Sequence, residues 1–425
     1  MKVLVVSNFY PPHHIGGYEL GCQAVVQRLR ARGHDVRVLT STFGQRAPKD
    51  EDYIYRRLPI SWVREPYAAH RVLRKLQAFR RFLGIDLPSR RIMRELCESF
   101  RPEVVYFWNL NGLTSLLVHT ARALGLKTTF FISDEWLLRW TASDRWLRWG
   151  SAVSAQGKFA LLKPLLRLAA AVVALPTDPP ELRNVQFASG YLREATVAGP
   201  LTISQAEVIH WGVDLDVFRF CPKTPAAVRL LHVGQVAHHK GVDTAIEALH
   251  WLRQTPGVAK ADLTIAGGAI DPKYEAYLRA LVSERRLEDA VHFVGVQARA
   301  AMVDLIAQSD IFVFPYRWRE GLSITVLEAM SMGTVVVGTA TGGNAEVLRD
   351  GENALVFPVD DAQALAACLR RLSADAELFR RLQAEARLTV EQNHDIDQMV
   401  NRIEQSLRKA LAGTAGDMEY AAGRE

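Results

Sequence analysis

Cysteine is scarce and scattered in this sequence. The 425 residues include only four, and no two of them have the C-x-x-C spacing that many zinc sites use: Cys22, Cys97, Cys221 and Cys368. Small disulfide-stabilised domains are, in contrast, dense in cysteine. The sequence therefore indicates neither a zinc site nor a disulfide framework, and it predicts a reducing compartment.

Long apolar runs are also missing. The run at the amino terminus ends at Val6, which is too short for a signal peptide. The stretch from Leu161 to Leu175 is interrupted by Lys163, Pro164 and Arg167, whereas a membrane-spanning helix needs about 20 apolar residues. We therefore expect a cytoplasmic protein without a membrane span.

The charge is ordinary in amount but uneven along the chain. A net charge of +6 with 49% apolar and 23% charged residues is typical of a globular protein, and 425 residues are enough for two domains. Basic residues are concentrated between Arg56 and Arg101: Arg57, Arg64, Arg71, Arg74, Lys75, Arg80, Arg81, Arg90, Arg91 and Arg94. They are either the solvated faces of helices or a surface for an anionic partner, such as a lipid diphosphate or the cytoplasmic face of a membrane. No nucleic-acid recognition motif accompanies them, so we expect no nucleic-acid binding.

A dinucleotide-binding fingerprint is absent as well. Met1 to Val6 predicts a strand, Tyr18 to Arg32 a helix and Val36 to Thr40 a second strand, so the chain begins with a β-α-β unit. The first loop is long and contains Gly16-Gly17 instead of G-x-G-x-x-G. Two glycines before a helix can serve a tight turn alone.

Strands and helices alternate over most of the chain, which predicts two α/β domains with parallel sheets and right-handed crossovers. Residues 53–101 instead show a helical and basic pattern. We predict an amino-terminal domain over 1–215, a linker over 216–227, a second domain over 228–390, a helix over 391–412 and a disordered tail over 413–425. The predicted strands lie at 1–6, 36–40, 104–108, 128–132, 169–175 and 206–210 in the first domain, and at 228–233, 263–266, 291–294, 311–314, 335–338 and 354–356 in the second.

The stretch from Arg319 to Met330 is the most informative part of the sequence. It follows a predicted strand, contains Gly321, where a backbone can approach a ligand closely, and continues with helical spacing. The first N–H groups of such a helix suit an anion, typically a phosphate. Glu320 precedes the helix and Glu328 lies roughly two turns into it. Ionised carboxylates only accept hydrogen bonds, so phosphates flanked by hydroxyls, as in a nucleotide-sugar, fit this pattern, although an arbitrary pair of glutamates is usually solvated.

The spacing of Glu320 and Glu328 resembles the E-x7-E motif of glycosyltransferase family 4, retaining enzymes also described as glycosyl transferases group 1. Further family motifs follow the same order between about residues 205 and 360: Gly234 to Lys240-Gly241, Gly267-Gly268, Val294-Gly295, Pro315, Gly342 to Glu346 and Gly351 to Val356. The resemblance implies a GT-B fold, in which two Rossmann-like domains face each other across a cleft and a final helix returns to the first domain. It places the acceptor on the first domain and the donor on the second.

The resemblance also implies roles for individual residues. Glu320 would bind hydroxyls of the transferred sugar, Glu328 the ribose and Lys240 the diphosphate, with Asp134 as a further catalytic group. Other donor contacts would come from the glycine loop, the strand ends, the backbone near the base and the start of the helix: Gly16, Gly17, Gly234, Gln235, Gly267, Val294, Val296, Gly321, Leu322 and Ser323. Gly342 and Gly343 would serve a turn.

Two of the departures from the family pattern affect the expected site. Family members usually have His-Asp where this chain has Ser133-Asp134, and an arginine where it has Gln235. Gln235 has no charge, so stabilisation of the leaving group would depend on Lys240 and the helix that follows Gly321. Asp134 has an equally good alternative role as a cap of the next segment. Asp214 and Asp216 lie in a segment next to the linker, and we expect no metal site there or elsewhere.

The sequence therefore predicts a retaining, metal-independent glycosyltransferase that needs no cofactor. Its donor would be a nucleotide-diphosphate-sugar, such as a UDP- or GDP-sugar. Its acceptor would be a glycan or a lipid-linked molecule, in the synthesis of bacterial cell-surface polysaccharide or glycolipid. The missing arginine and histidine leave a catalytically silent nucleotide-sugar-binding protein as one alternative, and the fold leaves an epimerase or a phosphorylase as another.

Overall fold

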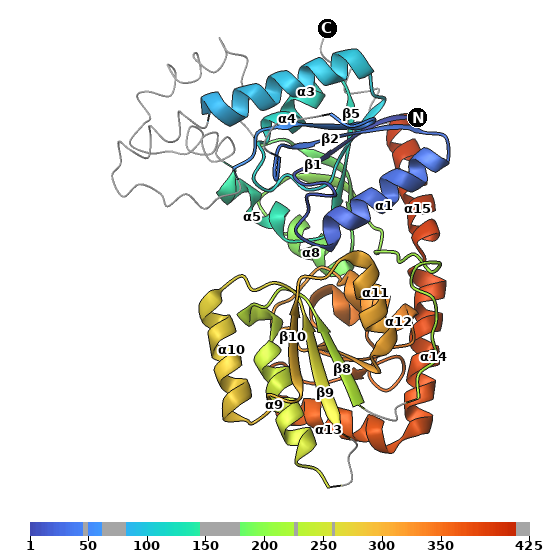
Figure 1. The fold of residues 1–425 in the computed structure, drawn as a ribbon. Helices are drawn as coiled ribbons and strands as arrows, with labels where there is room; N and C mark the ends of the chain where they lie inside the picture. The colour runs from blue at the N-terminus through green and yellow to red at the C-terminus, as the bar shows by residue number, and fades with distance from the viewer. Residues whose placement is uncertain (46–49, 62–81, 145–178, 225–227, 257–259, 414–425) are drawn as a thin grey trace. The chain divides into compact units, whose positions relative to one another are not determined.

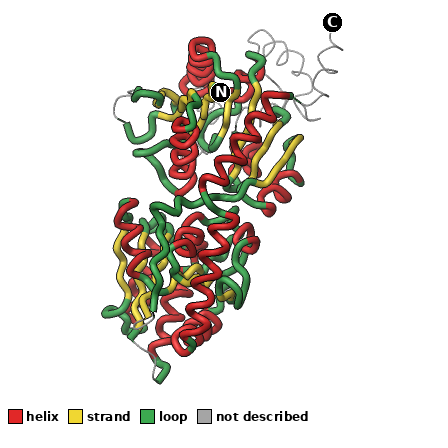
Figure 2. The backbone as a smooth tube through the Cα atoms, turned by 90° about the vertical axis from the view of Figure 1, so that its right-hand side faces the viewer, coloured by secondary structure: helices red, strands yellow, loops and turns green. Residues whose placement is uncertain are grey.

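The computed structural model describes residues 1–45, 50–61, 82–144, 179–224, 228–256 and 260–413 (Figure 1). The chain forms two compact units, Met1–Ile209 with Val400–Glu425 and His210–Met399. Each unit contains a parallel β-sheet with helices beside it, as Figure 2 shows. Two Rossmann-like α/β units were expected from the sequence, and the structure confirms them.

The sheet of the first unit has seven parallel strands in the order β3-β2-β1-β4-β5-β6-β7. Strand β1 is central, because Val3 pairs with Val36 of β2 on one side and with Val104 of β4 on the other. Central parallel strands are buried on both faces, which is why apolar runs identify them in the sequence. The strands are β1 (Lys2–Ser7), β2 (Asp35–Ser41), β3 (Ile54–Leu58), β4 (Val104–Phe107), β5 (Lys127–Ile132), β6 (Leu182–Phe187) and β7 (Ile203–Val208).

Helices of the first unit connect these strands and cover the sheet. Pro88 stands at the start of α3, where its missing N–H has no helical partner to lose. The helices are α1 (Gly17–Ala31), a π-helical turn (Phe82–Asp86), α3 (Leu87–Phe100), α4 (Leu116–Ala123), α5 (Trp136–Ser143) and α8 (Gly190–Val197). Trp136 and Trp140 of α5 are buried and meet edge to face at 5.4 Å, so both belong to the core.

The last helix, α15 (Ile396–Ala412), belongs over most of its length to the first unit. Ser406 on this helix accepts a hydrogen bond from Nε2 of Gln186 in β6 at 2.7 Å. Buried side chains recur with the spacing of one helix face: Val400, Ile403, Leu407 and Ala410. The expected return of the final helix to the first domain is therefore confirmed. From residue 414 on, the predicted tail lies outside the described residues.

The sheet of the second unit has six parallel strands in the order β10-β9-β8-β11-β12-β13. The strands are β8 (Val228–Val233), β9 (Ala261–Ala266), β10 (Val291–Gly295), β11 (Ile311–Phe314), β12 (Val335–Gly338) and β13 (Leu355–Val356). The helices are a 3₁₀ turn (His238–Lys240), α9 (Val242–Arg253), α10 (Pro272–Glu284), α11 (Arg299–Gln308), α12 (Ile324–Ser331), a second 3₁₀ turn (Gly342–Glu346), α13 (Ala362–Ala374) and α14 (Ala376–Asn393). All six predicted strands of this unit are present.

The helical prediction for residues 53–101 is wrong at its beginning. Residues 54–58 form the edge strand β3, paired in parallel with β2. The strand was missed because Arg56 places a charged residue at a buried position of the alternating pattern. Its side chain is buried and donates to the carbonyls of Tyr10 at 2.9 Å and Pro11 at 2.6 Å. Strand β6 and helix α8 were not predicted. The predicted strand at 169–175 lies outside the described residues.

Among the residues that the structure describes, no helix is both long and apolar enough to cross a membrane. This finding covers α14 and α15, the longest helices within the described ranges at 18 and 17 residues.

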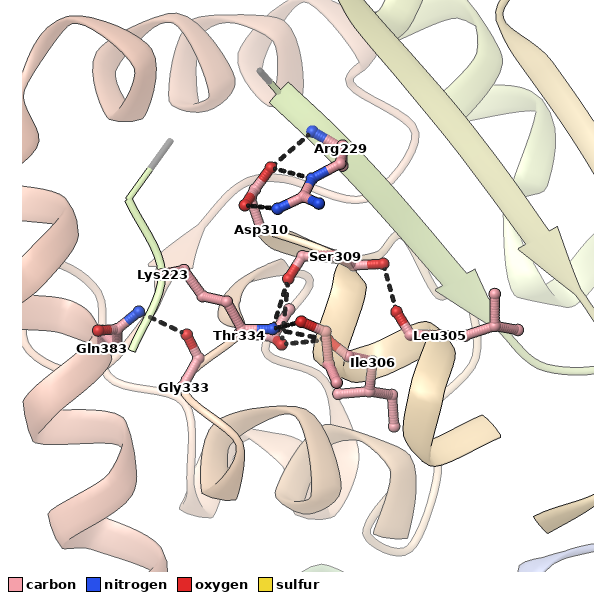
Figure 3. A network of polar contacts seen from close by, with 10 residues as sticks. Lys223, Arg229, Leu305, Ile306, Ser309, Asp310, Gly333, Thr334 and Gln383 are labelled. Atoms are coloured by element: carbon pink, nitrogen blue, oxygen red, sulfur yellow. Dashed lines mark hydrogen bonds and ion pairs between the residues drawn. The ribbon is translucent and has the colours of Figure 1, made fainter. Parts of the chain in front are cut away.

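A buried ammonium group fixes the segment before β8 to the second unit (Figure 3). Nζ of Lys223 donates to the carbonyls of Ile306 and Ser309, both at 2.9 Å, and to that of Ala307. These carbonyls end helix α11, where the last carbonyls have no partner within the helix and form the negative end of its dipole. Thr334 donates to the Ile306 carbonyl as well, at 3.0 Å.

Replacing Lys223 by methionine is therefore expected to lower the free energy of unfolding by about 1–2 kcal/mol, because buried carbonyls lose their donor. Thermal unfolding of the full chain measures this effect. Lys273→Met, at an exposed lysine in the first turn of α10, is the control. Equal midpoints for the two variants would contradict the prediction.

Candidate active site

The residues singled out in the second half of the sequence gather at the carboxyl ends of neighbouring strands. Gly234 follows β8, Gly267 follows β9, Val294 lies at the end of β10, and the segment 315–323 follows β11. Open parallel sheets bind ligands at this edge. The sequence motifs and the topology therefore agree on one place in the second unit.

Two of the glycines at this edge are required by close packing of the backbone. Gly267 has φ +149°, and a Cβ there would stand 1.7 Å from the carbonyl oxygen of Gly234. Gly241 has φ +65°, and a Cβ there would stand 2.0 Å from the carbonyl oxygen of Pro315. Packing between loops explains both glycines without a ligand, so the predicted donor contacts of Gly234 and Gly267 stay predictions.

Lys240 and Glu320 meet in an ion pair across this edge. Nζ of Lys240 bonds to Oε1 of Glu320 and lies 3.9 Å from the centroid of the Tyr316 ring. The side chains are 12% and 28% exposed. Burial lowers the pKa of Lys240, and the charge of Glu320 opposes that shift. The two residues for which the sequence predicts contact with diphosphate and sugar are thus side by side, and an anion that binds Lys240 has to compete with Glu320.

Arg317 ties together the two segments that provide this pair. Its guanidinium donates to both carboxylate oxygens of Asp243, at 2.9 and 2.8 Å, and also pairs with Asp360. It further donates to the carbonyl of His238 at 2.5 Å, and its backbone N–H donates to His239 at 3.0 Å. The loop before Glu320 is therefore fixed to the turn that ends in Lys240. Sequence analysis missed Arg317, because its partners are about 40 to 80 positions away.

Arg317→Lys is expected to weaken donor binding about tenfold, because lysine keeps the charge but cannot bind Asp243 through two parallel hydrogen bonds. Titration calorimetry with a nucleoside diphosphate measures the change. Arg253→Met is the control, since Arg253 makes the same two-pronged contact with Asp289 at the far end of α9. An unchanged affinity in Arg317→Lys would show that donor binding does not need the two parallel hydrogen bonds from Arg317 to Asp243.

Helix α12 begins at Ile324, two residues after Leu322, where the helical spacing in the sequence begins. Its N-cap is Ser323, which makes no side-chain cap bond in the described part of the chain. The N–H of Ser323 donates to Oδ1 of the buried Asn344 at 3.0 Å, and the N–H of Gly343 donates to the Glu320 carbonyl at 2.8 Å. The turn 342–346 therefore holds the loop before α12 in place, which is the turn role expected of Gly342 and Gly343.

Glu328 is the most deeply buried carboxylate of the site. It is 1% exposed, and its Oε1 lies 2.7 Å from the guanidinium of Arg299. Its Oε2 is buried and has no hydrogen-bond partner among the described residues. Burial raises the pKa of Glu328, while Arg299 lowers it. An unpaired acceptor of this kind suits a hydroxyl donor. Arg299 was not predicted from the sequence, although it begins α11 shortly after Val294 and Val296, the predicted base contacts.

The predicted base contacts lie on an exposed edge. Val294 is 37% and Val296 80% exposed, and Nε2 of Gln297 donates to the Val294 carbonyl at 2.5 Å. Gln235, at the end of β8, is half-buried. These positions are open to a ligand, and their contacts with a base or a diphosphate remain predictions.

In the first unit, Gly16 and Gly17 stand at the start of α1, and Asp134 follows β5. The N–H of Gly16 donates to Oε2 of Glu19 at 2.9 Å, so this carboxylate caps α1. Oδ1 of Asp134 accepts from the N–H of Trp136 at 2.9 Å, which supports its alternative role as a cap. Desolvation by the groups packed around it raises the pKa of Asp134 to about 6, and the charge of Glu19 adds to this shift. Sequence analysis missed Glu19.

No group of three or more His, Cys, Asp or Glu in the described residues is placed to hold a metal ion. Asp214 instead accepts from the N–H groups of Asp216 at 3.1 Å and Val217 at 3.2 Å, so it caps a turn.

Comparisons with known proteins address both units. Residues 225–389 match the model of glycosyl transferases group 1, and residues 16–178 match that of a glycosyl transferase 4-like domain. The chain is 25% identical to a glycogen synthase of Mycobacterium tuberculosis (strain CDC 1551 / Oshkosh), over 93% of this chain and 91% of the relative. It is 32% identical to the putative colanic acid biosynthesis glycosyltransferase WcaL of Escherichia coli (strain K12), over 48% of this chain and 51% of that one.

A solved structure has the same fold. HepE of Anabaena, in complex with UDP and glucose, superimposes with a TM-score of 0.66 at 17% identity, covering 96% of this chain and 100% of that one.

Proposed function

The chain belongs to the group 1 glycosyl transferases with a GT-B fold, and from this premise we propose that it transfers a sugar, with retention, from a nucleotide-diphosphate-sugar to a glycan or lipid-linked acceptor. The single observation that supports the donor site best is the partly buried Lys240–Glu320 pair at the carboxyl ends of β8 and β11. A lysine ammonium can neutralise a leaving diphosphate, and a carboxylate can accept bonds from sugar hydroxyls.

The proposed donor lies along the edge of the second sheet. Its base would contact the backbone at Val294 and Val296, its ribose would donate to the free Oε2 of Glu328, and its diphosphate would face Lys240 and the start of α12. Charge that develops on the leaving group would be met by this fixed ammonium and by the N–H groups at the helix start, without a metal ion. The binding of UDP by HepE makes a uridine nucleotide the first candidate.

The proposed acceptor belongs to cell-surface polysaccharide or glycolipid synthesis, and the likeness to WcaL, a putative glycosyltransferase of colanic acid biosynthesis, supports this proposal. A peripheral membrane contact through the stretch Arg56 to Arg101 remains part of the proposal. Two of its arginines are already engaged, since Arg56 is buried and Arg57 is paired with Asp50. Any such contact would therefore depend on the other basic residues, several of which lie between 62 and 81, outside the described residues.

A panel of nucleotides and nucleotide-sugars tests the donor role. A ligand that binds only the folded state stabilises it, by about 2.7 kcal/mol at a concentration 100 times its Kd. We expect one nucleoside diphosphate and its sugar derivatives to raise the unfolding midpoint, and the same nucleotide to be released when an acceptor is added. If no nucleotide shifts the midpoint at millimolar concentration, the donor role is wrong.

Gln235 favours a second candidate function, a nucleotide-sugar-binding protein without transfer. The uncharged amide replaces the arginine that the family places there, so the positive charge near the diphosphate is smaller. Donor binding without nucleotide release across a broad acceptor panel would support this candidate.

A further inference from the structure

An exposed pair of stacked rings stands next to the Lys240–Glu320 pair. The indole of Trp318 is 56% exposed, and its ring lies 4.4 Å from the ring of His239 at an interplanar angle of 22°. His239 directly precedes Lys240, and Trp318 stands two positions before Glu320. No sequence motif pointed to these two rings.

The backbone under both rings is fixed. The N–H of Arg317 donates to the His239 carbonyl at 3.0 Å, and Oγ1 of Thr341 donates to the Trp318 carbonyl at 3.1 Å. The guanidinium of Arg317 ties the same loop to Asp243. A ligand that stacks on a surface already held in place loses little conformational freedom in the protein. Trp318 is thus an exposed aromatic ring on a fixed loop, on which a flat apolar ligand group can stack.

The imidazole is uncharged at neutral pH. Burial lowers the pKa of His239 to about 4, and the charge of Lys240 adds to this shift. The stacked pair therefore presents aromatic surface without a second cation, directly beside one buried ammonium and one carboxylate.

We propose that Trp318, supported by His239, stacks against the apolar C–H face of the transferred pyranose ring. This inference rests on the proposed function and adds the contact that would recognise the sugar. A pyranose has an apolar face together with hydroxyls at its rim, so it suits an aromatic surface that is flanked by a hydrogen-bond acceptor. Trp318 provides the surface and Glu320 the acceptor.

The position along the sheet edge favours the sugar over the base. Oε2 of Glu328, which has no hydrogen-bond partner in the described part of the chain, and Arg299, which pairs with Oε1 of Glu328 and begins α11 after β10, mark the nucleoside end of the proposed donor. Trp318 follows β11, and β9 and β8 separate β10 from β11 in the sheet. The rings thus belong to the end of the donor that carries the sugar.

Calorimetric titration with UDP and UDP-glucose, and with GDP and GDP-mannose, tests the inference, because only the second member of each pair contains the sugar. For whichever pair the natural chain binds, we expect Trp318→Ala to lower the affinity for the nucleotide-sugar about tenfold and to leave the affinity for the bare nucleoside diphosphate unchanged. Trp318→Phe should retain most of the affinity. Trp251→Ala is the control, since Trp251 is also an exposed tryptophan beside a histidine, on α9.

Each other outcome overturns a different statement. If Trp318→Ala keeps full affinity for the nucleotide-sugar, the stacking role is wrong while the donor site stands. If it loses affinity equally for both members of the pair, the indole contacts the base or the diphosphate, and the sugar assignment is wrong. If the natural chain binds none of the four nucleotides, the proposed function is wrong, and this inference is wrong with it.

Discussion

Replacing Lys240 by alanine is expected to lower the rate of nucleotide release from the donor by about 10²–10³-fold, the usual effect of removing one preorganised charge from a reacting centre. The effect should be at the upper end of that range, because Gln235 supplies no second charge. The ammonium is already held in place by Glu320 and by the face of Tyr316, so little reorganisation is needed when charge develops on the leaving diphosphate.

Steady-state measurement of nucleoside diphosphate release, with saturating donor and an acceptor panel, gives this rate for the natural chain and for Lys240→Ala. Lys273→Ala is the control for the loss of an exposed lysine. Gln235→Arg restores the family residue and should raise turnover or tighten donor binding. If the natural chain binds donor but none of the variants releases nucleotide, the enzyme proposal has to give way to the binding protein.

The fold was largely predictable because its strands are buried on both faces. Apolar runs such as 311–314 and 335–338 contain no alternating polar residues, so they are read as buried strands. Pro315 follows the first run, and Gly338 ends the second. The prediction missed β3 because of Arg56, whose guanidinium donates to two main-chain carbonyls and to the carboxylate of Glu51. A buried arginine looks the same in a sequence as an exposed one, so the hydrophobic pattern fails where a charge has local partners.

The candidate site was predictable only in part, for a related reason. Glu320, Glu328 and Lys240 belong to motifs with fixed spacing, so the sequence could indicate them. Arg299 and Arg317 act through ion pairs with residues 29 to 74 positions away, namely Glu328 and Asp243. Such pairings depend on how strands lie beside one another in the sheet, and no local pattern records them.

The ion pair of Arg299 and Glu328 illustrates what such a hidden partner does. Glu328 is 1% exposed and Arg299 46% exposed, so the arginine keeps contact with water while the carboxylate has almost none. Without Arg299, the carboxylate would be an unpaired buried charge. Breaking a buried pair typically costs about 3–5 kcal/mol, and the solvent access of Arg299 places this case lower, at about 2–3 kcal/mol.

Arg299→Met is therefore expected to destabilise the second unit in a pH-dependent way. Burial raises the pKa of Glu328 above its ordinary value of 4.5, and removal of Arg299 raises it further. Between the pKa of Glu328 in the unfolded chain and its raised pKa in the folded variant, the folded state holds a proton that the unfolded state has lost. Stability therefore falls as the pH rises through this interval. Urea unfolding of Arg299→Met should show the loss growing as the pH rises above the ordinary pKa of a glutamate, more steeply than in the natural chain.

The double variant Arg299→Met/Glu328→Gln separates the lost charge partner from lost packing. Glutamine cannot ionise, so the double variant should recover most of the stability at pH 8 and lose the added pH dependence. Glu328→Gln alone should weaken nucleoside diphosphate binding about 10-fold or more, because a charged acceptor for the ribose hydroxyl is replaced by a neutral one. A pH profile of Arg299→Met that runs parallel to that of the natural chain would contradict the prediction that Arg299 holds down the pKa of Glu328.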